Sequence, residues 1–379
     1  MMVTTSKLRK LGKPDKSLLS RIKRRIYFMQ RRLPRRPVKG LPEGIAFETV
    51  NRLCLEHLGE PLQRVSYVHL SGWKVSGAYR LVLKSVNGRT WHLIYKNAIY
   101  SLEQIPALRG LPIRPGPPEY LVYKHPEGAL SQYLPTVYLC LEIVPGRHYQ
   151  YVLEDLSQEY QRLSEYTKLA KKRNIVSAAS ELPKLHHALS EWSIAADPTH
   201  LLRFDREFST DLLQYAEENL ERYVQETADK TVSRAIEHWS LISEVHGRSE
   251  FYECQTTQPI HGDYHTGHVY VHKENPDRIK LIDWEWTGFG RPHADLATLL
   301  QGKDPDIEQQ ALVRYAEQDN RLSFNEHKRL YEWCQLERGL LNAAFLARQQ
   351  MESSRKAKWV PEFIQRSILR ALRAQEQLI

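Results

Sequence analysis

The sequence predicts an α+β protein in which a small antiparallel β-sheet lobe precedes a larger helical lobe. Three observations support this fold class. Runs rich in β-branched and aromatic residues crowd into residues 60–156, helical periods fill the chain from residue 157 onward, and one strand-rich island interrupts them at 259–286. With 379 residues the chain is long enough for two lobes with separate cores. A ligand is expected in the cleft between them.

Turn signals divide the first region into strands. Asn87-Gly88 lies between two strand-like runs and predicts a tight hairpin, and Pro145-Gly146 predicts a second one. We expect a five-stranded sheet here, with short helices at 44–58 and 119–124. The expected strands are Val65–Leu70, Tyr79–Val86, Trp91–Lys96, Val137–Val144 and Tyr149–Leu153.

The second region shows apolar residues at spacings of three and four, the period of amphipathic helices. No internal repeat or low-complexity tract interrupts it. The expected helices are Ala178–Trp192, Thr210–Thr227, Lys230–His246, Asp306–Glu317, Asn325–Gln349 and Pro361–Gln377.

The net charge of +9 is concentrated at the N-terminus. Residues 1–40 hold fourteen of the 54 Lys and Arg residues and one of the 45 Asp and Glu residues, a balance of +13. The remaining chain has 40 basic and 44 acidic residues, a balance of −4. The body is therefore mildly acidic, and the charge does not make the whole protein a nucleic-acid binder. We treat residues 1–43 as a basic extension.

A helical period inside this extension runs from Ser17 to Leu33, with basic side chains over much of its surface. Packing of this helix on the body is the simplest interpretation. An anionic membrane surface, contacted through residues 17–36, and a nucleic acid are the alternatives. We favour the membrane surface of these two, because the apolar stripe would then have something to bury into.

Nothing in the sequence predicts export or a membrane span. There is no run of eighteen apolar residues and no signal-peptide pattern at the N-terminus. The four cysteines, Cys54, Cys140, Cys254 and Cys334, form no CxxC pair, which is typical of a reducing compartment. We expect a cytoplasmic protein, with peripheral membrane association as an option.

The island at 259–286 carries the residues suited to chemistry. Two short apolar runs flank a polar turn, which predicts a hairpin. A loop rich in Asp and His precedes the first run, and the second run ends in Asp283. The hairpin should bring Asp263 and Asp283 to one edge of the sheet. Phosphoryl transfer needs such a pair, because one carboxylate orients and deprotonates the attacking hydroxyl and another holds the Mg²⁺ on the nucleotide phosphates.

The string His261-Gly262-Asp263-x-His265, followed about twenty residues later by Ile282-Asp283-Trp284, resembles the aminoglycoside phosphotransferase and choline kinase superfamily. The resemblance covers roughly residues 60–300. It implies a protein-kinase-like bilobal fold, with a nucleotide-binding N-lobe at 44–156 and a helical C-lobe at 157–379. It also implies ATP or GTP with Mg²⁺ as cofactors, and a small-molecule acceptor such as an antibiotic, a choline-like amine, a sugar or a lipid head group.

The same resemblance assigns roles residue by residue. Asp263 matches the catalytic base, Asp283 the metal ligand, and Asp295 of the later Asp-Leu-Ala a structural carboxylate near the catalytic loop. Lys96, ending a strand, matches the residue that contacts the phosphates. For its acidic partner we expect Glu119, with Glu103 and Glu127 as alternatives. The nucleotide-binding hinge is expected at Glu154 and Leu156, and a loose glycine loop at Gly72–Gly77.

One position departs from the family pattern. His268 stands where the family usually has an Asn that serves as a second metal ligand, and Mg²⁺ prefers oxygen to imidazole. Macrolide kinases of the same superfamily look similar here, so we expect His268 to assist catalysis or the metal. Glu285, beside Asp283, could face a cationic acceptor.

Other interpretations stay open. We expect His261 to hold the catalytic loop by hydrogen bonds. A zinc cluster of its neighbours His265, His268 and His272 with Asp263 would leave Lys96, the Ile282-Asp283-Trp284 segment and the two-lobe layout unexplained. A catalytically impaired kinase-like scaffold that binds a nucleotide or a partner is the main alternative. Acceptor identity, nucleotide preference and oligomeric state are not encoded in these motifs.

Overall fold

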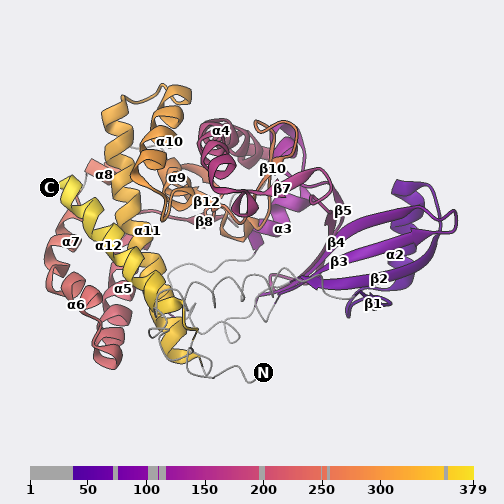
Figure 1. Ribbon diagram of the computed structural model, residues 1–379, viewed down its shortest axis with the longest axis horizontal. Helices are drawn as coiled ribbons and strands as arrows, with labels where there is room; N and C mark the ends of the chain where they lie inside the picture. The colour runs from indigo at the N-terminus through magenta and orange to yellow at the C-terminus, as the bar shows by residue number, and fades with distance from the viewer. Residues whose placement is uncertain are drawn as a thin grey trace, which may run out of the picture.

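The structure, a computed structural model, describes residues 37–70, 76–100, 110, 117–195, 201–248, 250–253, 257–353 and 357–379. A sheet lobe, indigo to purple, stands beside a larger group of helices (Figure 1). The predicted α+β class with a small antiparallel sheet followed by a helical part is confirmed. The helix predicted at Ser17–Leu33 and most of the glycine loop at Gly72–Gly77 lie outside the described residues.

The N-terminal lobe is a six-stranded antiparallel sheet in the order β1-β2-β3-β4-β6-β5. All five predicted strands are present, and both predicted hairpin turns join the expected neighbours. The expected count of five was wrong, because two residues ahead of the lobe pair with β2 at its edge. The strands are β1 (Val38–Lys39), β2 (Leu62–Leu70), β3 (Ser76–Ser85), β4 (Thr90–Ile99), β5 (Val137–Val144) and β6 (His148–Glu154).

The helix predicted at 44–58 is shorter and less regular than expected. It consists of α2 (Phe47–Leu53) continued by a π-helical turn, η2 (Cys54–Leu58). Gly59, in the left-handed region at φ 72°, ends it. Val50 and Leu53 are buried with strand residues in the core of this lobe, so the helix covers one face of the sheet.

A short linker of helical turns and strands leads into the second lobe. Asp155 lies just after β6, and Arg80 of β3 ion-pairs with it at 2.6 Å. This contact ties the sheet to the hinge between the lobes. The linking elements are α3 (Pro117–Lys124), η4 (Gly128–Tyr133), β7 (Tyr160–Arg162) and η5 (Leu163–Glu165).

The second lobe is built around α11, which packs against α5, α9 and α12 (Figure 1). None of the helices in the described part of the chain is both long and apolar enough to cross a membrane. The helices are α4 (Lys168–Ala195), α5 (Arg206–Thr227), α6 (Lys230–Glu237), α7 (Trp239–His246), α8 (Glu250–Glu253), α9 (Pro292–Leu299), α10 (Pro305–Gln318), α11 (Phe324–Glu352) and α12 (Val360–Leu378).

Two helix predictions need correction. The helix expected at Lys230–His246 is two helices, because His238 leaves the helical region at φ −98° and ψ 12°. Both halves nevertheless pack on α12. The helix expected from Ala178 starts ten residues earlier, at Lys168. Its basic first turns have no apolar period, so the pattern could not reveal them.

The strand-rich island forms two small sheets inside the helical lobe. β10 (Val269–His272) pairs antiparallel with β11 (Ile279–Leu281) and with β7. β12 (Gly288–Gly290) pairs antiparallel with β9 (Gln258–Ile260) and parallel with β8 (Leu202–Arg203). The short turn η7 (Trp284–Trp286) joins the two sheets. The predicted catalytic hairpin is thus present, anchored on both sides.

Candidate active site

The hairpin of β10 and β11 closes the distance between the two predicted aspartates. Val269 pairs with Leu281, and the backbone N–H of Ile282 donates to the carbonyl oxygen of His268 at 3.2 Å. The loop before β10 and the residue after β11 therefore meet at one end of the hairpin, as the sequence predicted.

A glycine allows the loop to approach η7. Gly262 has φ +80°, and a Cβ built on it would lie 2.0 Å from the backbone oxygen of Trp286. No side chain fits in that space, and the left-handed backbone favours glycine in any case. The residue between His261 and Asp263 is therefore fixed by the packing of the loop.

Asp295, in the first turn of α9, holds this loop from behind. Its two carboxylate oxygens accept hydrogen bonds from the backbone N–H groups of His261 and Gly262, each at 2.8 Å. The ring of His186 is 3.0 Å from the same carboxylate. Burial alone would raise the pKa of Asp295, but the bonds and charge of His186 and the loop lower it. The structural role expected of Asp295 is confirmed.

Lys96 reaches out of the sheet lobe toward the hairpin. Its Nζ donates to Oε1 of Glu119 at 2.9 Å and to Oδ1 of Asp283 at 2.5 Å, although Asp283 lies 187 positions further along the chain. Burial would lower the pKa of Lys96, yet the charges of Asp283 and Glu119 raise it well above its ordinary value. The ammonium group therefore joins the two lobes as a cation.

Glu119 is the acidic partner, as expected. It is fully buried, and α3 packs against η7, the turn that follows Asp283. Its second oxygen accepts a hydrogen bond from the hydroxyl of Tyr100 at 3.1 Å. Glu127 instead precedes η4, and Glu103 lies outside the described residues. Tyr100 was missed by sequence reasoning, because a tyrosine after a strand gives no motif.

His268 bridges the two aspartates. Its Nδ1 lies 3.3 Å from Oδ2 of Asp263, and its Nε2 lies 3.1 Å from Oδ2 of Asp283. Burial alone would lower the pKa of this imidazole, but the two carboxylates raise it to about 9. The two carboxylates therefore favour the protonated form of His268.

Asp283 and Glu285 show how acidic the site is. Burial would raise the pKa of Asp283, yet Lys96 and His268 hold it well below its ordinary value. Burial and the neighbouring carboxylates Asp283 and Glu119 raise the pKa of Glu285 to about 8, against the lowering effect of Lys96. The neighbouring carboxylates lie so close that Glu285 keeps its proton near neutral pH.

This donor set fits a hard divalent cation. Carboxylate oxygens are the ligands Mg²⁺ prefers, and a bound cation would lower the raised pKa of Glu285 by offsetting the charges of the neighbouring carboxylates. The ammonium of Lys96, at 2.5 Å from Asp283, stands in for such a charge. Asp283 would hold the ion, with His268 beside it.

The zinc cluster predicted as an alternative is only partly assembled. Asp263, His265 and His268 each offer one ligand atom, all within 4.8 Å of one another. His272 instead lies on β10 and accepts backbone hydrogen bonds from Glu274 and Asn275. The ring of His261 holds the loop: its Nδ1 accepts a hydrogen bond from the backbone N–H of Asp263 at 3.2 Å, and its Nε2 is 3.2 Å from the carbonyl oxygen of Ile282, beyond β11.

The two residues predicted at the nucleotide-binding hinge, Glu154 and Leu156, occupy different environments. The carboxylate of Glu154 accepts from the backbone N–H of Thr136 at 2.9 Å and from Nζ of Lys280 at 2.8 Å. Leu156 is buried. Lys280 was another residue that sequence reasoning missed, because a single lysine on a predicted strand is ordinarily a surface residue. Its bond fastens the hairpin to the hinge.

Part of the chain matches a known protein family. Residues 118–333 match the family model described as the phosphotransferase enzyme family. No curated protein matches this sequence closely enough to count as a relative.

The fold is similar to solved structures of low sequence identity. Choline kinase from Cryptosporidium parvum shares 12% identity over 88% of this chain and 96% of that one, with a TM-score of 0.54. The GDP complex of aminoglycoside 2′-phosphotransferase-IIIa shares 11% over 88% of this chain and 100% of that one, with a TM-score of 0.52. A GDP and kanamycin complex of APH(2″)-IIIa shares 11% over 86% and 99%, at 0.53. At such identities the likeness concerns the fold. The chain belongs to the phosphotransferase enzyme family.

Proposed function

We propose that this protein transfers the γ-phosphate of ATP or GTP to a hydroxyl group of a small-molecule acceptor. One observation carries the proposal: Glu119, Lys96, Asp283, His268 and Asp263 form an unbroken line of charged contacts of 2.5 to 3.3 Å across the two lobes. Phosphoryl transfer depends on positioning and electrostatic stabilisation, and such a line supplies both.

Each member of the line has a role in this proposal. Lys96 contacts the α- and β-phosphates, and buried Glu119 holds its ammonium in place. Asp283 would hold Mg²⁺, and the ion when bound would supply positive charge to the nucleotide phosphates. The nucleotide base lies at the hinge, near Glu154 and Leu156.

Asp263 faces the acceptor. Its carboxylate orients the acceptor hydroxyl and takes its proton as the oxygen forms a bond to the γ-phosphorus, and the bond to the bridging β-oxygen breaks. His268, between the two aspartates, keeps their separation fixed and places a positive charge near the transferred group. Asp295 positions the loop from below and does not touch substrate.

The acceptor site is assigned to the helical lobe in this proposal. We assign nucleotide binding to residues 44–156 and acceptor binding to the helices of residues 157–379. Structural neighbours include a choline kinase and a GDP and kanamycin complex, so choline-like and aminoglycoside acceptors come first in a screen. Sugars and lipid head groups belong in the same screen as antibiotics and choline-like amines.

Nucleotide titration tests the proposal. ATP and GTP would be titrated calorimetrically into the protein with and without Mg²⁺, in parallel with Asp283→Asn. Metal-dependent binding that the variant loses is the expected result. Binding would then justify an acceptor screen that follows phosphate transfer. Absence of nucleotide binding under every metal condition would remove the kinase assignment.

A non-catalytic role is the second candidate, and one observation favours it. Both ring nitrogens of His268 are occupied by Asp263 and Asp283, so an imidazolium sits among the metal-binding groups. The unaltered protein would then bind nucleotide without phosphate transfer or hydrolysis, and His268→Asn would restore transfer. That pair of results would support a binding protein that has lost catalysis. Transfer by the unaltered protein would dismiss it.

A further inference from the structure

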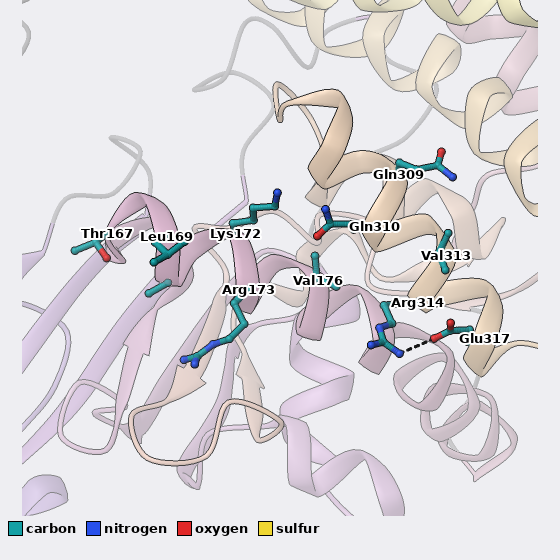
Figure 2. Close-up of a pocket in the computed structure, with 11 residues that line it drawn as sticks. Thr167, Leu169, Lys172, Arg173, Val176, Gln309, Gln310, Val313, Arg314 and Glu317 are labelled. Carbon is teal, nitrogen blue, oxygen red and sulfur yellow. Dashed lines mark hydrogen bonds and ion pairs between the residues drawn. The ribbon is translucent and has the colours of Figure 1, made fainter.

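A groove of about 870 Å³ lies between α4 and α10 in the helical lobe. Figure 2 shows the two helices facing each other, with Val176, Gln310 and Val313 near its middle. Leu169, at the start of α4, is 82% exposed. The volume is in the range of roughly 300–1,000 Å³ that is typical of binding pockets. The residues that line it are Thr167, Leu169, Ala170, Lys172, Arg173, Val176, Gln309, Gln310, Val313, Arg314 and Glu317.

The margin of this groove is basic. Arg314 is neutralised by Glu317 at 2.8 Å (Figure 2). Lys172 and Arg173, in contrast, have no carboxylate within 4.0 Å among the described residues. The groove therefore presents two uncompensated cations beside apolar side chains, and the exposed Leu169 is one of those side chains.

The basic character extends along the first turns of α4. Lys168 and Lys171 lie in its first turn, where the helix carries no acidic residue. Cations at a helix N-terminus are disfavoured by the helix dipole, so fold stability does not explain this run. Burial and the charges of Lys171 and Arg370 lower the pKa of Lys303 to about 8, which shows that positive charge accumulates around this end of α4.

We propose that the groove docks an acidic amphipathic helix of a partner protein. Apolar side chains of the partner, spaced at i, i+3, i+4 and i+7, fill the groove along Leu169, Val176 and Val313, and its carboxylates pair with Lys172 and Arg173. From Leu169 to Val176 the helix rises about 10 Å at 1.5 Å per residue, which matches two turns of a docked helix.

The concave shape selects this occupant over a bilayer. A membrane surface is broad and flat, so it would contact exposed Leu169 but would leave Val176 and Val313, between the two helices, unfilled. An acidic helix satisfies both the apolar floor and the cationic margin. The groove residues are distinct from Lys96, Glu119, Asp263, His268 and Asp283, so binding of a helix here can be tested without the proposed phosphate transfer.

A synthetic peptide tests the idea. The probe is a fluorescein-labelled helix of about 14 residues, roughly four turns, with Leu at the four anchor spacings and Glu at most other positions. Binding to the full chain would be followed by fluorescence anisotropy. We expect saturable binding, weakened at least tenfold by Leu169→Glu and by the double variant Lys172→Glu/Arg173→Glu. Lys328→Glu, a charge reversal at an exposed site of α11 outside the groove, should bind like the unaltered protein.

Three outcomes would overturn the inference. The first is no saturable binding of the probe by a folded protein. The second is equal binding of a permuted peptide with the same composition but no apolar stripe, which would reduce the contact to general charge attraction. The third is loss of binding in Lys328→Glu to the same extent as in the groove variants. If the protein binds no peptide but sediments with phosphatidylserine vesicles, and Leu169→Glu abolishes that sedimentation, this face contacts a membrane instead. Circular dichroism and urea unfolding confirm that each variant is folded.

Discussion

Removing the carboxylate of Asp295 should destabilise the protein and release the loop that carries Asp263. In Asp295→Ala, the backbone N–H groups of His261 and Gly262 lose their acceptors at 2.8 Å while staying buried. Orphaning buried groups costs about 1–3 kcal/mol each, and breaking a buried charged network costs about 3–5 kcal/mol. We therefore expect the free energy of unfolding to fall by about 4 kcal/mol.

The conservative variant Asp295→Asn should lose about half as much, because its amide oxygen can still accept one of the two N–H bonds. Urea unfolding followed by circular dichroism measures both. Asp211→Ala, at an exposed position on α5, is the control, with an expected change within about 0.5 kcal/mol. If Asp295→Ala lowers the free energy of unfolding by less than about 1 kcal/mol, the loop does not depend on this carboxylate and the reasoning is wrong.

Further predictions concern other buried groups. Lys96→Met leaves buried Glu119 without a cation, so the free energy of unfolding measured in urea should fall by about 3–5 kcal/mol. The double variant Lys96→Met/Glu119→Gln should recover part of that loss. No recovery would argue against coupling between Lys96 and Glu119. In Gly262→Ala the new Cβ would lie 2.0 Å from a backbone oxygen at φ +80°, whereas in Gly88→Ala it would have no neighbour within 4 Å at φ +85°. Gly262→Ala should therefore lower the free energy of unfolding by at least about 2 kcal/mol more than Gly88→Ala. Equal thermal stabilities of the two variants would refute this. Burial, with a neighbouring histidine, lowers the pKa of His293 to about 3. Since protonation then favours the unfolded chain, this residue should remove about 1.4 kcal/mol of stability per pH unit below 6.5; His293→Gln should show a shallower loss between pH 6.5 and 4.

The sequence was most informative where chemistry and turns constrain it. Asn87-Gly88 located a hairpin because glycine readily takes the positive φ that such a turn needs, and Gly88 has φ 85° in the turn between β3 and β4. The pairing of β10 with β11 followed from two short apolar runs around a polar turn, and it placed Asp263 and Asp283 at one end. Lys96 could be selected only through its resemblance to a family pattern, since a lysine that ends a strand has no signal of its own.

Contacts between distant elements were beyond the sequence. The bridging position of His268 depends on the loop geometry that Asp295 imposes from α9. The break at His238 has no proline or glycine to announce it, and tertiary packing decides it. Tyr100 and Lys280 hold Glu119 and Glu154 through single hydrogen bonds, which leave no periodicity to read.

The backbone conformation of Asp283 depends on its ion pairs. Asp283 has φ 64° and ψ 63°, a left-handed conformation that is unusual for a residue other than glycine. A glycine at this position would relieve about 1–2 kcal/mol of backbone strain. Substitution by glycine would also leave the buried ammonium of Lys96 and the ring of His268 without the carboxylate that pairs with both, and that loss exceeds the relief of strain. The ion pairs of Asp283 therefore hold its backbone in a conformation that the local sequence alone would not favour.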